Sequence, residues 1–458
     1  MLLRPLCRLV TALLILLMLP AAASAAGFGD PASQWLPSAA DASWVYEWAD
    51  SSYAPPTRER YTLDATAGNT FRVRWTTSSE DLGNGDSATQ SDGFMDFQRT
   101  EAGVVNLNWN STPPPQQMPI LCASATSCGN SLAGTYYMMI WGTRSPVLAE
   151  PLLAHTEWSS VGGAGNDVGS TNRYLGMQRV FVPAWRTSVP AAVVQSQITQ
   201  AGALGDPYGS GVRTVWWVYG VGPVKIEFRH ASGETGTSQL ISTSLTPKTA
   251  PPDTNYLPLN RGDRAVFRWT NSKYMPKAST QQFDVSQVVN NSSRVDVKRL
   301  SGPIGVTGAY VFATRTSGVT NLAANTQAAS RAKFPKLGPS FLPKASRRHI
   351  FTPYDLMTYG FNPVLPAYPV KGTTWRSSTK SRDYQVFGVT GVSKVVGTKT
   401  IRVPAGRFHA LVVQSSLRQK GYSFGSGKRT MWFAPNKGLV KLVFRHADGS
   451  VSTVERVR

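Results

Sequence analysis

The chain has 458 residues and a formal net charge of +21 at pH 7, and 41% of its residues are hydrophobic. This length is enough for two or three domains, each with a substantial buried core. Charged residues make up only 16% of the chain, below the usual quarter. Gly, Pro, Ser and Thr are abundant, so the composition argues against long helices and favours strands and turns.

The first 25 residues are typical of a cleaved signal peptide. Two arginines form a positive n-region, an apolar h-region follows at 9–19, and Ala-Ser-Ala at 23–25 fits a cleavage site. The alternative is a membrane anchor, but the apolar run is short for a span of roughly 20 residues. Cys7 precedes this run, whereas a lipoprotein cysteine would follow it. No later transmembrane run is visible, so we expect a secreted or periplasmic protein.

Two cysteines remain after removal of the signal peptide. Cys122 and Cys128 stand in the segment LCASATSCG. A close, even pair in an exported chain predicts a disulfide, which would stabilise so small a loop by roughly 2 kcal/mol. The alternative is a redox or metal pair, but the spacing is not C-x-x-C and no histidine is nearby in the sequence.

A whole domain is duplicated in this sequence. The segment at 209–233 recurs at 425–449, and both carry G-S-G-x-R-T-x-W, then G-x-V-K, then F-R-H-A-x-G. Matches such as GVVNL with GVTNL extend the repeat upstream. The period is far longer than that of solenoid repeats, so the sequence predicts a tandem pair. We expect a first domain at 27–245, a Pro-rich linker at 246–259 and a second domain at 260–458.

Most of both copies alternates between apolar and polar residues. In the segments 224–230 and 440–446, alternate positions are apolar and share one face, as expected of strands. The Asp-Gly pair at 448–449 favours a tight hairpin. One short helix is expected in each copy, around 136–143 and 353–360. The prediction is therefore antiparallel β-sheet with little helix.

The end of the second copy resembles a known group of domains. V-P-A-G-x-F-x-A-L-V-V at 403–413 and W-F-A-P-x-x-G-L-V-K at 432–441 are similar to the closing region of exported bacterial β-rich domains of unknown function. Those domains are related in shape to the LolA/LolB-type lipoprotein-carrier half-barrels. The resemblance covers roughly the last sixty residues, and the first copy departs from it, with Ala-Trp-Arg at 184–186. It implies two tandem, mainly β, half-barrel-like domains with concave apolar faces, and it brings no catalytic residues.

The two copies differ sharply in charge. Residues 27–246 contain 12 Lys and Arg against 18 Asp and Glu, a balance of −6, whereas residues 247–458 contain 33 against 8, a balance of +25. Because one fold carries both balances, the charge belongs to the surface and its partners. Packing of the acidic copy against the basic one would account for only part of the difference.

One stretch of the second copy, 330–350, combines cations with phenylalanines and prolines. The prolines predict a loop or extended arm instead of a helix. The arm is either a solvated loop or an anion-binding segment, in which each cation near an anionic membrane would contribute about 1 kcal/mol. The candidate binding residues are Arg331, Lys333, Lys336, Lys344, Arg347 and Arg348.

The sequence shows no recognisable catalytic pattern. Its five histidines lack metal-ligand spacing, and neither a nucleophile elbow nor a phosphate loop is present. His230 and His446 end apolar strand faces just before turns, where a histidine packs its ring and bonds a turn carbonyl. Arg213 and Arg429 are also interpreted as structural. We therefore expect no metal, no cofactor and no enzymatic activity.

These features predict an exported, non-enzymatic binding protein of the bacterial cell envelope. It would bind an apolar or amphiphilic ligand, or an anionic envelope component through the basic second copy. Candidate partners are a lipid, a lipoprotein or an anionic envelope polymer. Nucleic acid would explain the charge, but export argues against it. The alternatives are a structural or adhesion module, which filled and cavity-free sheets would favour, and a secreted hydrolase. The oligomeric state is left open.

Overall fold

A computed structural model describes most of the chain after the predicted signal peptide at 1–25. The described residues are 32–77, 92–111, 119, 121–124, 127–129, 133–162, 168–200, 207–289, 291–330, 334, 352–377, 389–419 and 421–458. The signal peptide lies outside them. So do all six cations predicted to bind anions, namely Arg331, Lys333, Lys336, Lys344, Arg347 and Arg348.

The first copy forms a twelve-stranded antiparallel sheet within the described residues. Its strands are β1 (Ser43–Asp50), β2 (Ala54–Ala67), β3 (Thr70–Thr76), β4 (Asp92–Thr100), β5 (Gly103–Ser111), β8 (Leu148–Ala149), β9 (Glu157–Val161), β10 (Val168–Val182), β11 (Thr187–Gln200), β12 (Gly211–Val218), β13 (Gly222–His230) and β14 (Thr235–Thr243).

The second copy repeats this sheet with the same number of described strands. They are β15 (Arg264–Asn271), β16 (Met275–Val289), β17 (Ser292–Ser301), β18 (Ile304–Arg315), β19 (Gly318–Ser330), β20 (Leu365–Pro366), β21 (Thr374–Arg376), β22 (Val389–Val403), β23 (Gly406–Gln419), β24 (Gly427–Ala434), β25 (Gly438–His446) and β26 (Val451–Arg456).

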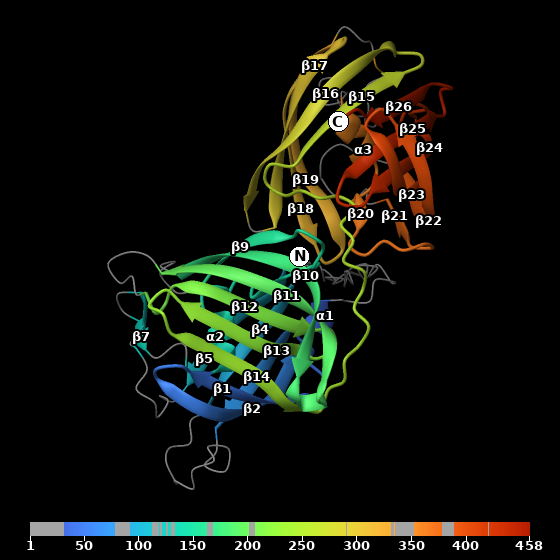
Figure 1. Cartoon of the computed structure of the whole chain (residues 1–458). Helices are drawn as coiled ribbons and strands as arrows, with labels where there is room; N and C mark the ends of the chain where they lie inside the picture. The colour runs from blue at the N-terminus through green and yellow to red at the C-terminus, as the bar shows by residue number, and fades with distance from the viewer. Residues whose placement is uncertain are drawn as a thin grey trace, which may run out of the picture.

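The two sheets share one strand order. The first runs β8-β5-β4-β3-β2-β1-β14-β13-β12-β11-β10-β9, and the second runs β20-β19-β18-β17-β16-β15-β26-β25-β24-β23-β22-β21. In each copy the first strand therefore pairs with the last. Each sheet curls into a barrel-like shape, and the two stand in tandem (Figure 1). The structure confirms the predicted fold class, which is mainly β with two tandem antiparallel sheets.

Helices are short and few among the described residues. They are α1 (Ala32–Trp35), α2 (Thr135–Ile140), α3 (Pro353–Thr358) and the 3-10 turn η1 (Pro183–Trp185). Both predicted helices exist, but each ends two or three residues earlier than expected. Gly142 at φ 69° and Gly360 at φ 82° follow them in the left-handed region, which ends a helix and which glycine adopts without steric cost.

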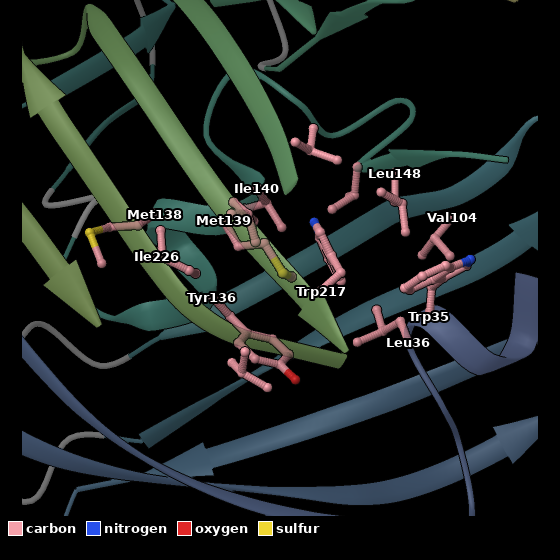
Figure 2. Packing of buried hydrophobic residues seen from close by; sticks show 14 of the residues in the cluster. Trp35, Leu36, Val104, Tyr136, Met138, Met139, Ile140, Leu148, Trp217 and Ile226 are labelled. Carbon is pink, nitrogen blue, oxygen red and sulfur yellow. The ribbon is translucent and has the colours of Figure 1, made fainter. Parts of the chain in front are cut away.

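The concave face of each sheet is filled by its helix and by aromatic side chains. All six residues of α2 are buried, and so are all six of α3. Figure 2 shows Tyr136, Met139 and Ile140 of α2 lying among Trp217 and other buried side chains of the strands. In the second copy Tyr354 of α3 stacks on Phe283, with ring centroids 4.2 Å apart. These interiors are therefore packed hydrophobic cores.

The segment between the sheets is anchored to both. The backbone of Asp253 accepts a hydrogen bond from Ala154 N at 2.6 Å, and its side chain accepts one from Tyr174 OH at 2.9 Å. Leu257 and Leu259 belong to the core of the second sheet. The predicted linker thus connects the two domains and also contributes residues to the core of the second.

Polar contacts also join the two sheets directly. The backbone N of Thr316 donates to Glu101 O at 2.9 Å, and Asn291 Nδ2 donates to Ala102 O at 3.0 Å. The guanidinium of Arg315 pairs with the carboxylate of Glu101. This pair joins the acidic copy to the basic one, as the charge difference between them suggested. A cavity of about 30 Å³ lies nearby, room for roughly one water.

The two remaining cysteines lie on a separate two-stranded hairpin. It consists of β6 (Leu121–Ser124) and β7 (Ser127–Gly129). Cys122 and Cys128 are directly opposed in its antiparallel ladder. Opposed residues of such a ladder have Cα atoms about 4.5–5.5 Å apart, which suits a disulfide. The backbone geometry is compatible with a disulfide between them, and the disulfide stays a prediction.

Candidate functional site

A buried arginine holds the helix of each copy against its sheet. Arg213 Nη1 donates to Met138 O at 2.5 Å and to Trp141 O at 2.8 Å, at the end of α2. Arg429 Nη1 lies 2.5 Å from Leu356 O and 2.9 Å from Tyr359 O, at the end of α3. Carbonyls at a helix C-terminus attract cations and need donors. The two arginines are therefore structural, as the sequence predicted.

Burial makes protonation of both guanidinium groups less favourable. Desolvation lowers the pKa of Arg213 to about 9, and it lowers the pKa of Arg429 to the same value. Both groups remain charged at neutral pH, because about 9 is still above 7. The helix carbonyls supply the negative dipole ends that this buried charge requires.

The shared histidines occupy equivalent places beside these helices. His230 stacks on Tyr208 with ring centroids 4.0 Å apart, and its Nδ1 lies 2.6 Å from Tyr208 O. His446 stacks on Phe424 at 4.1 Å, and its Nδ1 lies 2.5 Å from Phe424 O. Each ring packs and bonds a carbonyl, which is the predicted structural role.

The outer nitrogens of the two histidines meet different partners. His230 Nε2 lies 3.8 Å from Asp50 Oδ2, and His446 Nε2 lies 2.8 Å from Ser452 Oγ. All four side chains are buried. A histidine beside an acid or a hydroxyl is what the hydrolase alternative required, but a substrate would also need access to it. Burial favours a structural role for both pairs, although Asp50 also contributes to the wall of an open surface hollow.

A buried carboxylate on β2 of the first copy stands where the second copy has an amide. Glu59 accepts hydrogen bonds from Tyr61 OH at 3.1 Å and from Thr135 N at 2.9 Å, at the start of α2. Burial raises the pKa of Glu59. In the second copy Gln281 takes this place, because Glu59 pairs with Tyr46 and Gln281 pairs with Phe267 at matching ladder positions.

The Glu59→Gln variant is expected to stabilise the first sheet by about 1 kcal/mol at pH 8, because it removes a desolvated charge. A carboxyl whose folded pKa lies above its unfolded value loses stability as pH rises between the two values. The free energy of unfolding of the wild-type protein should therefore fall as pH rises over that window, and that of the variant should not. Urea unfolding at pH 5 and pH 8 measures this. Weaker folding of the variant at pH 8 would mean that the two hydrogen bonds outweigh desolvation.

An open hollow lies on the first copy beside the turn between β1 and β2. Its volume is about 580 Å³, and Asp50, Tyr53, Thr235 and Thr237 contribute to its wall. The wall is formed by a turn and strand ends on the surface, whereas the concave face of the sheet is filled. The hollow is thus distinct from the interior ligand site that the half-barrel resemblance implied.

The described part of the chain contains no group of three or more His, Cys, Asp and Glu residues placed to hold a metal ion. No helix among the same residues is both long and apolar enough to span a bilayer.

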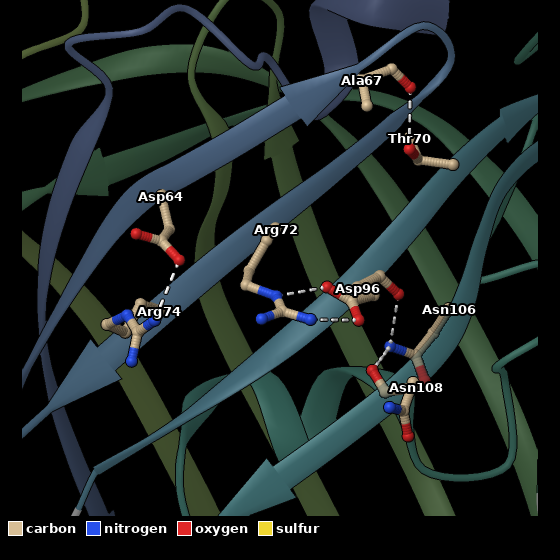
Figure 3. Close-up of polar contacts among 8 residues, drawn as sticks. All are labelled: Asp64, Ala67, Thr70, Arg72, Arg74, Asp96, Asn106 and Asn108. Carbon is tan, nitrogen blue, oxygen red and sulfur yellow. Dashed lines mark hydrogen bonds and ion pairs between the residues drawn. The ribbon is translucent and has the colours of Figure 1, made fainter.

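Several cations of the first sheet are paired with acids. Arg72 forms two hydrogen bonds with Asp96, from Nε at 2.7 Å and from Nη2 at 2.9 Å. Arg74 Nη2 lies 3.0 Å from Asp64 Oδ2 (Figure 3). These pairs neutralise charge on the surface of the acidic copy.

The second sheet carries a row of exposed cations across its outer face. Arg376 on β21 pairs with Val392 on β22, which pairs with Ser416 on β23. Ser416 pairs with Lys428 on β24, which pairs with Arg445 on β25. Arg418 lies two residues beyond Ser416 on the same face. We call Arg376, Arg418, Lys428 and Arg445 the basic row.

No member of the basic row is in an ion pair with a described residue. All four side chains are exposed. Lys428 and Arg445 are directly opposed in the ladder, where like charges destabilise a sheet. With strands about 4.8 Å apart, the row spans roughly 19 Å. The surface therefore concentrates positive charge at a cost to folding.

The first copy lacks this surface at the equivalent ladder positions. Ser159, Thr199 and Val212 replace Arg376, Arg418 and Lys428. The fourth position keeps an arginine, Arg229, but Glu227 Oε1 lies 2.9 Å from its Nη2. The second copy has Val443 where the first has Glu227, so Arg445 loses that partner.

The predicted arm and the basic row are separate segments of the second copy. The six predicted cations lie outside the described residues, but Phe334 between them is 4% exposed and stacks on Trp269 at 5.7 Å. The arm is therefore anchored to the core at this point. The basic row was not predicted from the sequence, although the outward position of Arg445 in its strand was a usable signal.

No family model matches this sequence, and no curated protein matches it. Two solved structures are similar to part of the chain. One is a "putative lipoprotein" of Parabacteroides distasonis, with 11% identity, 46% of this chain and 98% of that chain covered, and a TM-score of 0.25. The other is a "putative exported protein with YmcC-like fold" of Bacteroides fragilis, with 14% identity, 45% and 98% coverage, and a TM-score of 0.23. The predicted LolA/LolB relationship stays a prediction.

Proposed function

We propose that this protein is an exported, non-enzymatic protein of the bacterial cell envelope whose second domain binds an anionic envelope component. The observation that carries the proposal is the basic row, with four exposed cations that no described acid neutralises. Three of its positions are uncharged in the first copy. Export is supported by the predicted signal peptide at 1–25.

The interiors favour this function over carriage of an apolar ligand. Helices and aromatic rings fill both concave faces, so an acyl chain would have to displace core side chains. Filled sheets also favour a second candidate, an adhesion module that binds an acidic protein through the same surface. Both candidates place binding on the outer face of the second sheet.

The proposal is tested by replacing Arg376, Arg418, Lys428 and Arg445 with glutamine in the mature chain. At about 1 kcal/mol for each cation near an anionic surface, the variant should lose roughly 4 kcal/mol of binding to vesicles that contain phosphatidylglycerol. Wild-type binding should also weaken between 50 mM and 300 mM salt, because exposed charges are screened. Vesicle sedimentation measures both effects.

The matched control replaces four cations of the same domain that do have acidic partners. Arg264 pairs with Asp284, Arg294 pairs with Asp296, and Arg268 and Lys441 both pair with Glu455. The set Arg264→Gln, Arg268→Gln, Arg294→Gln and Lys441→Gln removes the same total charge. If both variants lose binding equally, net charge and not the basic row is responsible. If wild-type protein ignores anionic vesicles and soluble polyanions alike, the proposed function is wrong.

A further inference from the structure

Exposed valines lie beside the basic row. Val392 is 47% exposed and is the ladder neighbour of Arg376, so it stands within the row itself. Val396 is 37% exposed and occupies the bulge between Val395 and Gly397. An apolar side chain inside a cationic row adds nothing to the binding of a purely ionic, hydrated partner.

A third exposed valine lies on the turn that precedes β21. Val370 is 52% exposed, and its carbonyl accepts a hydrogen bond from Thr373 N at 3.0 Å. The same turn is tied to β22, because Gly372 N donates to Val395 O at 2.8 Å. This bond places the turn beside the bulge that contains Val396. Val392 thus stands in the row beside Arg376, whereas Val396 lies four residues further along β22 with the turn of Val370 beside it.

The first copy uses the equivalent turn differently. Leu153 stands in the place of Val370, because Trp158 and Trp375 are equivalent and each lies five residues further along. Leu153 is only 5% exposed and lines the contact with the linker and the second domain. Thr171 stands in the place of Val392. Leu175, which is 41% exposed, occupies the place of Val396 in the equivalent bulge. Two of the three exposed valines, together with the basic row, are therefore particular to the second copy.

We infer that the outer face of β21–β25 docks on the surface of an anionic lipid bilayer, with the basic row on the headgroups and Val370, Val392 and Val396 inserted between them. This inference rests on the proposed function and names its partner. Cations attract an anionic leaflet, and apolar side chains gain free energy when they leave water at the interface. A soluble anionic polymer offers the first contribution without the second.

The test compares phosphatidylglycerol-containing vesicles with inorganic polyphosphate as a soluble polyanion. The triple variant Val370→Ser, Val392→Ser and Val396→Ser should lose vesicle affinity by roughly tenfold, because three partly exposed valines no longer transfer apolar surface. Its affinity for polyphosphate should remain that of the wild type. Vesicles of phosphatidylcholine alone should bind weakly, because they carry no net charge.

The control for surface hydrophobicity is a triple variant elsewhere on the second sheet. Val289, Leu300 and Leu322 are 47%, 48% and 37% exposed, close to the exposures of the three valines. Their replacement by serine should leave vesicle affinity unchanged. Thermal midpoints of all variants check that the sheet is intact.

The outcomes separate this inference from the proposed function. If the valine variant binds vesicles like the wild type while the variant lacking the basic row does not, the partner is an anionic polymer or acidic protein. The bilayer is then not the partner, and the proposed function stands. If the control triple variant loses as much affinity as the valine variant, the docking face is wrong. If the wild type binds neither vesicles nor polyphosphate, both proposals fail.

Discussion

The Arg429→Ala variant is expected to lower the free energy of unfolding of the second domain by about 4 kcal/mol. It leaves the carbonyls of Leu356, Met357 and Tyr359 without the donor that they share, and each unsatisfied buried group costs about 1–3 kcal/mol. It also opens a cavity in a packed core. Urea unfolding, with hydrogen exchange of α3 and β24, measures the loss.

Two further variants show whether the loss is specific to a buried arginine that bonds a helix end. Arg213→Ala should destabilise the first sheet in the same way, because Arg213 bonds the end of α2. Arg445→Ala removes an exposed arginine from the neighbouring strand and should change stability by less than about 0.5 kcal/mol. A loss below about 1 kcal/mol in the Arg429→Ala variant would mean that water takes over the carbonyls.

The second domain is expected to lose about 3 kcal/mol of stability as pH falls from 6.5 to 4, because of His446. Burial lowers the pKa of His446 to about 4 from its ordinary 6.5. Between these values the unfolded chain binds a proton that the folded chain does not, so stability rises with pH over this window. The neutral ring donates from Nδ1 to Phe424 O and accepts at Nε2 from the hydroxyl of Ser452, an arrangement that protonation breaks.

The variant His446→Phe keeps the stacking on Phe424 and removes the titrating group. Its stability should be lower than that of the wild type at pH 7, but it should lack the decline between pH 6.5 and 4. His409 is exposed, so His409→Phe should leave the wild-type profile unchanged. Urea midpoints measured at half-unit intervals of pH follow the slope. An unchanged slope in His446→Phe would assign the decline to other groups.

The basic row has a consequence for the stability of the second sheet. Lys428 and Arg445 repel one another across neighbouring strands, and the equivalent pair of the first copy is Val212 with an arginine held by Glu227. The same ladder can therefore be built without the repulsion. A feature that costs folding energy and occurs in one copy alone is better explained by a partner than by the fold.

The architecture could be predicted because it depends on local patterns. The duplicated segments at 209–233 and 425–449 become β12–β13 and β24–β25, each the hairpin core of its sheet. The alternation of apolar and polar residues assigned His230 and His446 to the buried face. This works because successive side chains of a strand point to opposite faces of the sheet. The placement of each histidine before a turn also predicted its bond to a carbonyl.

The basic row could not be predicted from the sequence for a physical reason. Sequence clustering drew attention to six cations within residues 331–348, which lie outside the described structure. The members of the basic row come instead from four strands, and the sequence places Arg376 almost seventy residues before Arg445. Only the pairing register aligns them, and long-range register depends on packing and turn geometry across the whole sheet.

The sequence by itself determined the duplication, the antiparallel β class, the two short helices and the unequal charge of the copies. Each of these follows from composition or from the alternation of neighbouring residues. The tertiary structure alone decided that the concave faces are filled and that Arg213 and Arg429 bind the ends of the helices. It also decided which cations stand side by side without acids, because contacts between distant strands are fixed only when the sheet closes and buries its core.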